Sequence, residues 1–446
     1  MTRPARPTPS DAVAGLTAYR VPRHGAPIDL VLSGNEGVAP PRELLAGLAA
    51  ADLELLRRYP SAAPLEAALA ARFGLDPAQV VVTAGGDDAL ERTFRAFLGP
   101  GREVILPAPT FVMLPKYAQL VGATVVDVPW PGGAFPTDAV LAAVTPDTGA
   151  ICVVSPNNPT GAVAAGDDLR RLAAAAPHAV LVVDLAYGEM AAVDLTPVAL
   201  ALPNALVFRT FSKAWGLAGA RLGYALGPAE LVSWVRAAGN PYAVSGPSVA
   251  LGLARLAAGD ADVRRYVATV RAERAALTEL LREAGAEVPD SEANFVLARF
   301  PDHAAAQWLH DALAGLGIAV RLFGEEPPEL CGAVRITCPG NANDLTRVLH
   351  ALRSALEPGA LIVEDRLALA CLEGQPGWYF TTTAEGIAAA RAAGAVPIGL
   401  TGPEADPPEA LVAAGAARVV SGPDALEGVL PAAVRAQGLP SAPRVP

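Results

Sequence analysis

The sequence predicts an α/β protein built on a large, doubly wound and mainly parallel sheet, with a smaller α+β domain after it. Apolar runs of strand length alternate with helical segments, which is the pattern of a parallel sheet covered by helices. The strands end in glycine-rich or polar turns. The chain has 446 residues, of which 52% are hydrophobic, so it can bury a large core and divide into two to four domains or subdomains.

The predicted elements follow an N-terminal arm, residues 1–15, that we expect to be disordered. Strands are predicted at residues 28–32, 80–82, 103–106, 122–128, 150–154, 180–183 and 205–208. Helices are predicted from Pro41, over 64–73 and, as one long amphipathic helix, over 261–284. The smaller α+β domain is predicted from strands at 294–300 and 333–337 and a helix at 304–316.

Four side chains with chemical potential follow strands of the predicted sheet. Phe111, Asn158, Asp184 and Lys213 each stand at or just after the carboxyl end of a strand. Ligands of open α/β sheets bind at that edge. We therefore expect the four residues to lie together.

The stretch from Val207 to Tyr224 contains the residues most indicative of a cofactor. Lys213 follows a buried strand between Ser212 and an Ala-Trp pair, where it is poorly placed for solvation. A partly desolvated lysine can attack an aldehyde, and Thr210, Ser212 and Arg221 can hold an anion beside it. Pyridoxal 5'-phosphate (PLP) needs this combination. A loop lysine near a glycine turn is the alternative.

Three further positions point to anion or ligand contacts. Gly86 and Asp87 follow the strand at 80–82 and open a helix, whose free N–H groups suit a phosphate. Asp87 and Asp88 are expected to turn their side chains aside. Asn35 lies between two glycines that allow close approach of a ligand, with a plain loop as the alternative. Arg335, inside an apolar strand, is either a buried ion-pair partner or an anion receptor, and we favour the receptor.

Composition argues against several other classes of protein. The net charge is -11 without a basic stripe, so we expect no nucleic-acid partner. The N-terminus lacks an apolar signal core and no uncharged apolar run reaches 18 residues, so we expect a cytoplasmic protein without a membrane partner. The cysteines and histidines show no metal-ligand spacing, so no metal is expected and the cysteines are predicted to be buried thiols; they include Cys152, Cys331, Cys338, Cys371, His303 and His310.

Residues 17–356 together resemble the PLP-dependent aminotransferases of fold type I, and among them the histidinol-phosphate aminotransferase family. The resemblance rests on an ordered set of motifs: AYRVP, SGNEG, RYP, TAGGDD, PAPTF, SPNNPTG, VVDLAY, TFSKAWGLAGARLGY, NFVL and VRITCPG. It implies an aminotransferase that moves an amino group between an amino acid or amino phosphate and a 2-oxo acid such as 2-oxoglutarate.

The resemblance also implies roles for single residues. Lys213 would form the Schiff base and move a proton, Asp184 would pair with the pyridine nitrogen, and Tyr187 and Asn158 would hydrogen-bond the phenolic oxygen. Phe111 would stack on the ring. The phosphate would be held by Gly86, Asp87, Thr210, Ser212 and Arg221, and by Tyr59 from the neighbouring subunit of a homodimer. The substrate would meet Arg335, Asn35 and Tyr19.

The sequence departs from the family pattern at three of the motifs, one of which is the segment after Asn35, where Glu-Gly-Val replaces Glu-Asn-Pro. Leu185 stands where glutamate is usual, and Phe111 where tyrosine is frequent. These departures leave the substrate open. A PLP-dependent decarboxylase or an eliminating or cyclising enzyme is the alternative on the same scaffold, because fold does not fix which bond breaks. A non-catalytic scaffold is the more remote one.

The chain continues past the end expected for an aminotransferase. Residues 1–40 would form the arm and part of the small domain, 41–270 the PLP-binding domain, and 271–357 the small domain. Residues 358–446 predict a Rossmann-like α/β appendage, with strands at 360–363, 395–400 and 416–420 and helices at 386–393 and 410–415. The segment resembles half of a haloacid-dehalogenase-like (HAD) phosphatase. Glu364 and Arg366 stand where that family has two aspartates, which predicts an inactive appendage. A Rossmann-like extension unrelated to that family is the alternative.

Overall fold

A computed structural model describes residues 8–18, 25–50, 52–324, 328–370, 372, 374–423 and 425–426. Tyr19 and Cys371 lie outside the described residues. The described residues form two compact units. The first contains residues 8–18, 36–268 and 290–293, and the second contains residues 25–35, 269–289 and those from 294 onward.

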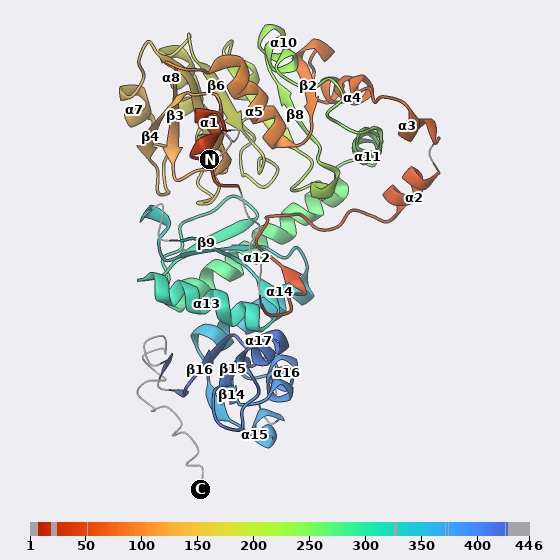
Figure 1. The fold of residues 1–446 in the computed structure, drawn as a ribbon. Coiled ribbons are helices and arrows are strands. Elements are labelled where there is room, and N and C mark those ends of the chain that lie inside the picture. Colours follow the sequence, from red (N-terminus) through yellow and green to blue (C-terminus); the bar gives the residue numbers. More distant parts are fainter. Residues whose placement is uncertain are drawn as a thin grey trace, which may run out of the picture. The chain divides into compact units, whose positions relative to one another are not determined.

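A seven-stranded sheet forms the centre of the first unit, in the order β2-β8-β7-β6-β5-β3-β4 (Figure 1). Its strands are β2 (Val80–Thr83), β3 (Glu103–Ala108), β4 (Thr124–Pro129), β5 (Thr148–Val154), β6 (Val180–Asp184), β7 (Ala205–Thr210) and β8 (Gly223–Leu226). β8 is antiparallel to both neighbours, and every other pair is parallel. The sheet is therefore mixed, although mainly parallel. β8 was not predicted.

Helices cover this sheet because their apolar faces match the buried strand side chains. α5, α6 and α10 pack on one face, where Phe94, Leu114 and Val232 join a single core with strand residues such as Leu206 and Phe208. The helices of this unit are α1 (Asp11–Ala14), α2 (Glu43–Ala49), α3 (Glu54–Arg57), α4 (Ala63–Phe73), α5 (Gly86–Phe97), α6 (Met113–Leu120), α7 (Thr137–Ala142), α8 (Gly166–Ala175), α9 (Thr196–Leu200), α10 (Ala229–Ala237) and α11 (Gly246–Ala257), with 3₁₀ turns η1 (Pro77–Gln79) and η2 (Ala218–Ala220). α1 shows that the expectation of a disordered arm was wrong for residues 11–14.

The long helix α12 (Ala261–Glu283) begins in the first unit and ends in the second. The second unit contains an antiparallel sheet in the order β11-β12-β9 and a parallel pair, β1 with β10. Its elements before residue 357 are β1 (Leu30–Val31), β9 (Phe295–Arg299), α13 (His303–Gly315), β10 (Ile318–Ala319), β11 (Arg321–Leu322), η3 (Pro328–Leu330), β12 (Ala333–Thr337) and α14 (Ala342–Leu356). α13 and α14 begin at side-chain caps, Asp302 and Asn341, which each accept a backbone N–H of the first turn.

A four-stranded parallel sheet, in the order β13-β14-β15-β16, follows in the same unit. Its elements are β13 (Ala360–Val363), α15 (Arg366–Ala370), β14 (Gly377–Thr381), α16 (Ala384–Ala392), β15 (Val396–Leu400), α17 (Pro408–Ala414) and β16 (Arg418–Val420). The three predicted strands are present, and β14, which was not predicted, lies between β13 and β15.

Large side chains join this sheet to α13 and α14. The rings of Trp308 and Trp378 lie 4.6 Å apart, and Trp378 Nε1 donates to the carbonyl of Ser354 over 2.7 Å. Arg418 pairs with Asp311 at 2.9 Å. The C-terminal sheet is therefore packed on α13 and α14 through β14 and β16.

A search of the described residues found no helix long and apolar enough to cross a membrane. The cysteines among them, Cys152, Cys331 and Cys338, are free thiols. Cys152 and Cys338 are buried as expected, whereas Cys331 is exposed, which corrects the prediction for that residue.

Candidate active site

The carboxyl ends of four neighbouring strands define one edge of the seven-stranded sheet. β7, β6, β5 and β3 are adjacent and parallel, so their carboxyl ends point the same way. Asp184 ends β6 and Lys213 follows β7, while Asn158 and Phe111 follow β5 and β3. The sequence-predicted residues therefore occupy the edge at which such sheets bind ligands.

Asp184 is the buried acid of this edge. The side chain is 7% exposed, and the Ala186 backbone N–H donates to Oδ1 over 3.0 Å. Burial raises the pKa of Asp184 from 3.8 to about 6, although the Ala186 N–H and the Lys213 charge act in the opposite direction. A cationic ring nitrogen beside this carboxylate would supply the charge that burial leaves uncompensated.

Lys213 lies in a tight turn next to Tyr187. Its Nζ is 5.6 Å from the centre of the buried Tyr187 ring. The Gly216 N–H donates to the Lys213 carbonyl over 3.0 Å, and Gly216 has φ +70°, a conformation that favours glycine. A side chain at Gly37 would collide with the same carbonyl, so backbone from residue 37 closes directly on the lysine turn.

A glycine cradle opens α5 at the same edge of the sheet. Gly85 has φ +88°, and a Cβ there would collide with the guanidinium of Arg221. A Cβ at Gly223 would collide with the Gly85–Gly86 backbone. The first N–H groups of α5 lack intrahelical acceptors, so this cradle of backbone donors and one arginine suits a phosphate.

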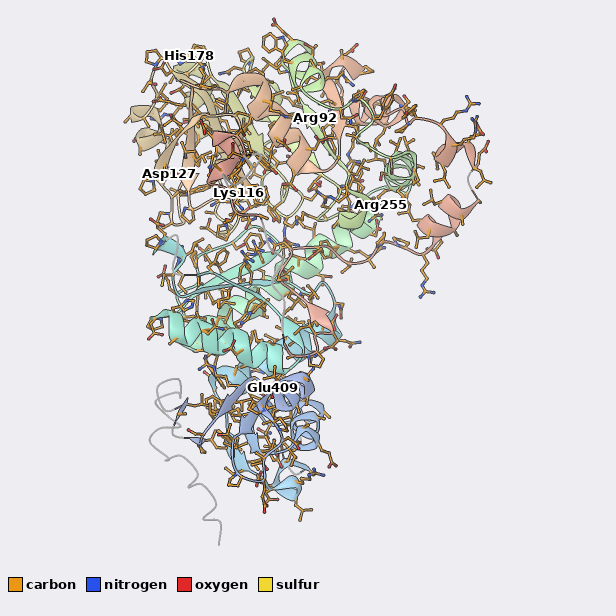
Figure 2. The ribbon with its side chains drawn as sticks, in the orientation of Figure 1. Arg92, Lys116, Asp127, His178, Arg255 and Glu409 are labelled. Atoms are coloured by element: carbon orange, nitrogen blue, oxygen red, sulfur yellow. The ribbon has the colours of Figure 1, made fainter. Side chains whose placement is uncertain are left out.

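The two aspartates after the cradle behave differently. Asp88 turns aside as predicted, since it accepts the Ala84 N–H over 2.8 Å and pairs with Arg92 of α5 at 2.7 Å; Arg92 is labelled in Figure 2. Asp87 does not turn aside. Its carboxylate lies 3.4 Å from Arg221 and accepts the Tyr117 hydroxyl over 3.2 Å, so the prediction was wrong for this residue.

The hydroxyls before Lys213 are buried within its turn. Thr210 Oγ1 lies 2.9 Å from Ser212 Oγ and accepts the Ser212 N–H over 3.0 Å. The Thr210 hydroxyl also lies 3.2 Å from the Leu222 carbonyl. Thr210 thus shapes the turn that presents Ser212 and Lys213.

The loop with Asn158 is fixed by its buried neighbour. Asn157 Nδ2 donates to the Pro109 carbonyl and to Thr160 Oγ1, each over 2.9 Å. The Thr110 hydroxyl donates to Asn157 Oδ1 over 3.0 Å. Asn157 therefore joins the loops that follow β5 and β3. Phe111, in the second of these loops, packs against the core of the sheet.

Asn35 and Arg335 belong to the second unit. Arg335 is 8% exposed, donates to the Ser33 carbonyl over 2.7 Å, and lies 5.2 Å from the centre of the Phe295 ring. Asn35 is buried, has φ 57°, and its Oδ1 accepts the Thr337 hydroxyl over 2.9 Å. Both contacts link the segment after β1 to β12.

Tyr59 is the most exposed of the predicted site residues that the structure describes. It is 81% exposed in the first unit and stacks on Tyr242 with ring centres 4.5 Å apart. Tyr187, by contrast, is 4% exposed, so within the described chain the two tyrosines differ greatly in burial.

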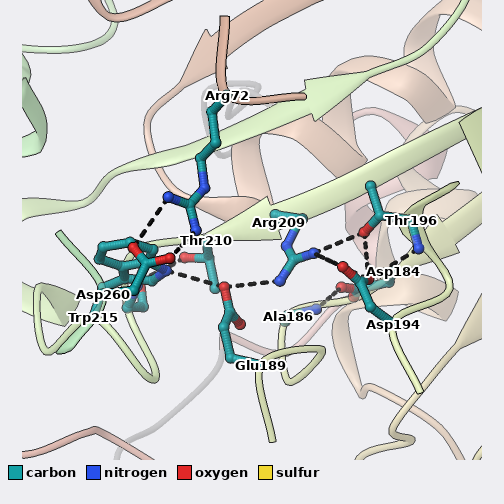
Figure 3. Close-up of polar contacts among 11 residues, drawn as sticks. Arg72, Asp184, Ala186, Glu189, Asp194, Thr196, Arg209, Thr210, Trp215 and Asp260 are labelled. Atoms are coloured by element: carbon teal, nitrogen blue, oxygen red, sulfur yellow. Dashed lines mark hydrogen bonds and ion pairs between the residues drawn. The ribbon is translucent and has the colours of Figure 1, made fainter. Parts of the chain in front are cut away.

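Sequence reasoning missed a charged cluster around Arg209, on the strand that precedes Lys213 (Figure 3). Buried Arg209 pairs with Glu189 at 2.9 Å, and Trp215 Nε1 donates to the same carboxylate over 3.0 Å. The signal was present, because an arginine inside the apolar run ending at residue 210 requires a buried carboxylate partner.

The fold and this edge define a class of protein: an α/β enzyme with a lysine, a buried carboxylate and a phosphate cradle, which together fit PLP. The family model for aminotransferases of class I and II matches residues 33–352. The chain belongs to this family. The predictions of an aminotransferase and of PLP as its cofactor are thereby confirmed.

Several relatives are similar over most of their length. The histidinol-phosphate aminotransferase of Cereibacter sphaeroides strain KD131 is 37% identical over 336 residues, which cover 72% of this chain and 90% of that protein. The aromatic amino acid aminotransferase of Mycobacterium avium strain 104 is also 37% identical, over 293 residues, which cover 64% of this chain and 82% of that protein.

Solved structures agree with this family. Histidinol-phosphate aminotransferase from Sinorhizobium meliloti, in complex with PLP, has a TM-score of 0.69 and 25% identity, and the match covers 79% of this chain and 99% of that chain. N-Succinyldiaminopimelate aminotransferase from Mycobacterium tuberculosis has a TM-score of 0.64 and 28% identity, with 72% and 92% covered.

Proposed function

We propose that this aminotransferase transfers an amino group from an amino acid, or from an amine phosphate such as histidinol phosphate, to a 2-oxo acid. The observation that carries the proposal is the shared edge at which Lys213, Asp184 and the Gly85–Gly86 cradle meet. When bound, PLP supplies an aldehyde for amines and an electron sink for the substrate α-carbon.

The residues of the edge divide the work among them. Lys213 Nζ would hold the cofactor aldehyde and would take and return the α-proton of the substrate. Asp184 holds the proton of the pyridine nitrogen, while Tyr187 and Asn158 orient the phenolic oxygen. Phe111 covers a ring face.

A second set holds the phosphate and the substrate. The N–H groups of Gly86 and Asp87, the Thr210 and Ser212 hydroxyls and the Arg221 guanidinium hold the phosphate. Arg335 binds the substrate carboxylate and Asn35 lines the substrate, with Tyr19 retained as a proposed substrate contact. The rigid seat of Arg335 on Ser33 and Phe295 supports its role, because a fixed guanidinium recognises a carboxylate with less loss of entropy.

Spectroscopy with amino donors tests the proposal directly. The PLP-loaded protein is expected to show a lysine-dependent absorbance band that borohydride removes and that Lys213→Ala lacks. Glutamate, aromatic amino acids and histidinol phosphate are then offered in turn, and conversion of the cofactor to its amine form identifies the donor. A band that persists in Lys213→Ala, or loss of carbon dioxide from the donor without amine formation, would contradict the proposal.

We further propose a homodimer in which Tyr59 completes the phosphate site of its partner. The large exposure of Tyr59 and its stacking on Tyr242 support this, since an exposed aromatic pair is a typical interface anchor. When Lys213→Ala and Tyr59→Ala chains are mixed in equal amounts after partial unfolding, about half of the dimers should be mixed and each should carry one intact site, so the whole mixture should regain about a quarter of wild-type activity. No recovery, with light scattering reporting a monomer, would refute the shared site.

We propose that the chain divides into an arm with part of the small domain (1–40), a PLP-binding domain (41–270), a small domain (271–357) and a C-terminal segment (358–446). The C-terminal segment is proposed to be an inactive HAD-like α/β domain. Glu364 Oε1 accepts the Thr382 N–H over 2.8 Å and Arg366 pairs with Glu385 at 2.8 Å, so neither side chain is poised for phosphoryl transfer. Phosphatase activity on p-nitrophenyl phosphate that Glu364→Gln removes would overturn this proposal.

The cytoplasm is the proposed location of the protein. The free thiols of Cys152 and Cys338 favour it, because thiols stay reduced there.

A further inference from the structure

Glu189 occupies a particular place between two loops of the active-site edge. It follows Tyr187 by two residues in the loop after β6, and its carboxylate reaches the loop after β7. The side chain is 13% exposed. Oε1 accepts the Trp215 Nε1 hydrogen over 3.0 Å and lies 2.9 Å from Arg209 Nη2 (Figure 3).

Trp215, two residues after Lys213, is buried and contacted from several sides. The ring is 3% exposed and lies 5.6 Å from the Phe211 ring. The guanidinium carbons of Arg72 and Arg255 lie 5.3 and 5.6 Å from its centre. Arg255 Nε also donates to the Trp215 carbonyl over 3.1 Å. Trp215 follows Lys213 by two residues within one tight turn, so its position fixes that of the lysine backbone.

Arg209 anchors the other side of Glu189. Its side chain is 6% exposed and points away from the core in which Phe208 packs, because successive strand residues face opposite sides of a sheet. It donates to Thr196 Oγ1 over 2.7 Å and lies 3.3 Å from Asp194. A buried guanidinium with this many partners is a fixed anchor for the Glu189 carboxylate. Removal of that carboxylate would leave part of the buried Arg209 charge uncompensated.

We propose that Glu189 is a positioning residue that sets Lys213 Nζ relative to Tyr187 and Asp184. Its carboxylate contacts both Arg209, on β7, and Trp215, in the lysine turn, while its own backbone continues the loop of Tyr187. The inference rests on the proposed role of Lys213. Loss of the carboxylate would let the two loops separate, and small displacements of a reacting group are costly for catalysis.

The test compares Glu189→Ala and Trp215→Phe, each loaded with PLP, with Asp194→Asn as the matched control. The control removes the charge of Asp194, the other acidic partner of Arg209. The Asp194 side chain is 51% exposed and bonds to no atom of Trp215 in the described contacts. The main readout is the pH midpoint of the absorbance of the Lys213-bound cofactor. We expect a change of at least half a pH unit for Glu189→Ala and less than about 0.2 for Asp194→Asn.

Kinetics and a double variant sharpen the comparison. We expect kcat to fall about tenfold in Glu189→Ala with the donor KM within twofold, because binding is retained while proton transfer is mispositioned. Trp215→Phe should move the midpoint in the same direction, and the double variant should match Glu189→Ala because both remove one contact.

Three results would overturn the proposal: an unchanged midpoint in folded Glu189→Ala, additive effects in the double variant, or an equal effect of Asp194→Asn. If Glu189→Ala does not fold, an unchanged midpoint in Trp215→Phe overturns it. Failure of the lysine assignment is separate, because Lys213→Ala would then still form a borohydride-trapped adduct.

Discussion

Replacing Asp184 by asparagine should make the PLP-free protein more stable and the PLP complex weaker. The folded state binds the Asp184 proton more tightly than the unfolded chain, because burial raises its pKa from 3.8 to about 6. The contribution of this group to stability is therefore greatest below pH 4 and is lost as pH rises through 6. Two pH units at about 1.4 kcal/mol each correspond to about 3 kcal/mol lost at pH 8.

Asp184→Asn keeps an acceptor for the Ala186 N–H but carries no charge. Urea unfolding of the PLP-free variant should show a gain of about 3 kcal/mol at pH 8 and about half of this at pH 5. PLP affinity should fall at least tenfold, because the pyridine nitrogen loses its anionic partner. The exposed control Asp147→Asn should change neither quantity. A gain that is equal at the two pH values, or no gain at pH 8, would refute the reasoning.

Further predictions concern the rest of the chain. Trp378→Ala, which removes a fully buried indole beside Trp308, should cost about 3–5 kcal/mol in urea unfolding, and a loss under 1 kcal/mol would contradict the packing described. A chain ending at Glu357 should still form the PLP adduct but associate in size-exclusion chromatography, because Trp308 becomes exposed; a monodisperse, equally stable truncation would argue otherwise. Arg221→Ala should weaken PLP at least tenfold in equilibrium titration while pyridoxal, which has no phosphate, binds within twofold. Glu273→Gln should stabilise the protein at pH 8 but not at pH 4, since burial raises the Glu273 pKa to about 7; thermal unfolding at both pH values checks this.

Much of the active-site edge could be predicted because strand ends are marked by residue type. Asp184 and Lys213 are polar side chains placed directly after long apolar runs, and parallel strands bring such ends to one edge. Gly85 and Gly86 could be read as a cradle because they stand between a buried strand and a helix start, where free backbone N–H groups suit a phosphate. The local sequence therefore indicated both the functional residue types and the edge of the sheet at which they lie.

Other features depend on partners that are distant in sequence. The direction in which Asp87 points follows from Arg221, 134 positions away, and not from its place at a helix start. β14 was not predicted, although Trp378 to Thr381 are strand-forming residues, because this short run has no chemical motif at its end and is fixed as a strand by pairing with β13 and β15. The contact of Glu189 with Trp215 joins two loops and has no local sequence pattern.

The paired indoles of Trp308 and Trp378 give the protein a natural optical probe. Their rings lie 4.6 Å apart and are inclined by 55°, a geometry in which the excited states of two indoles couple. Their coupled circular dichroism should report only the seam between α13 and the C-terminal sheet. The first unit contains Trp130, Trp215 and Trp234, and of these Trp215 stands two residues after Lys213. A change in tryptophan emission that accompanies cofactor binding and is absent from Trp215→Phe would therefore report the lysine turn, separately from the circular dichroism of the indole pair.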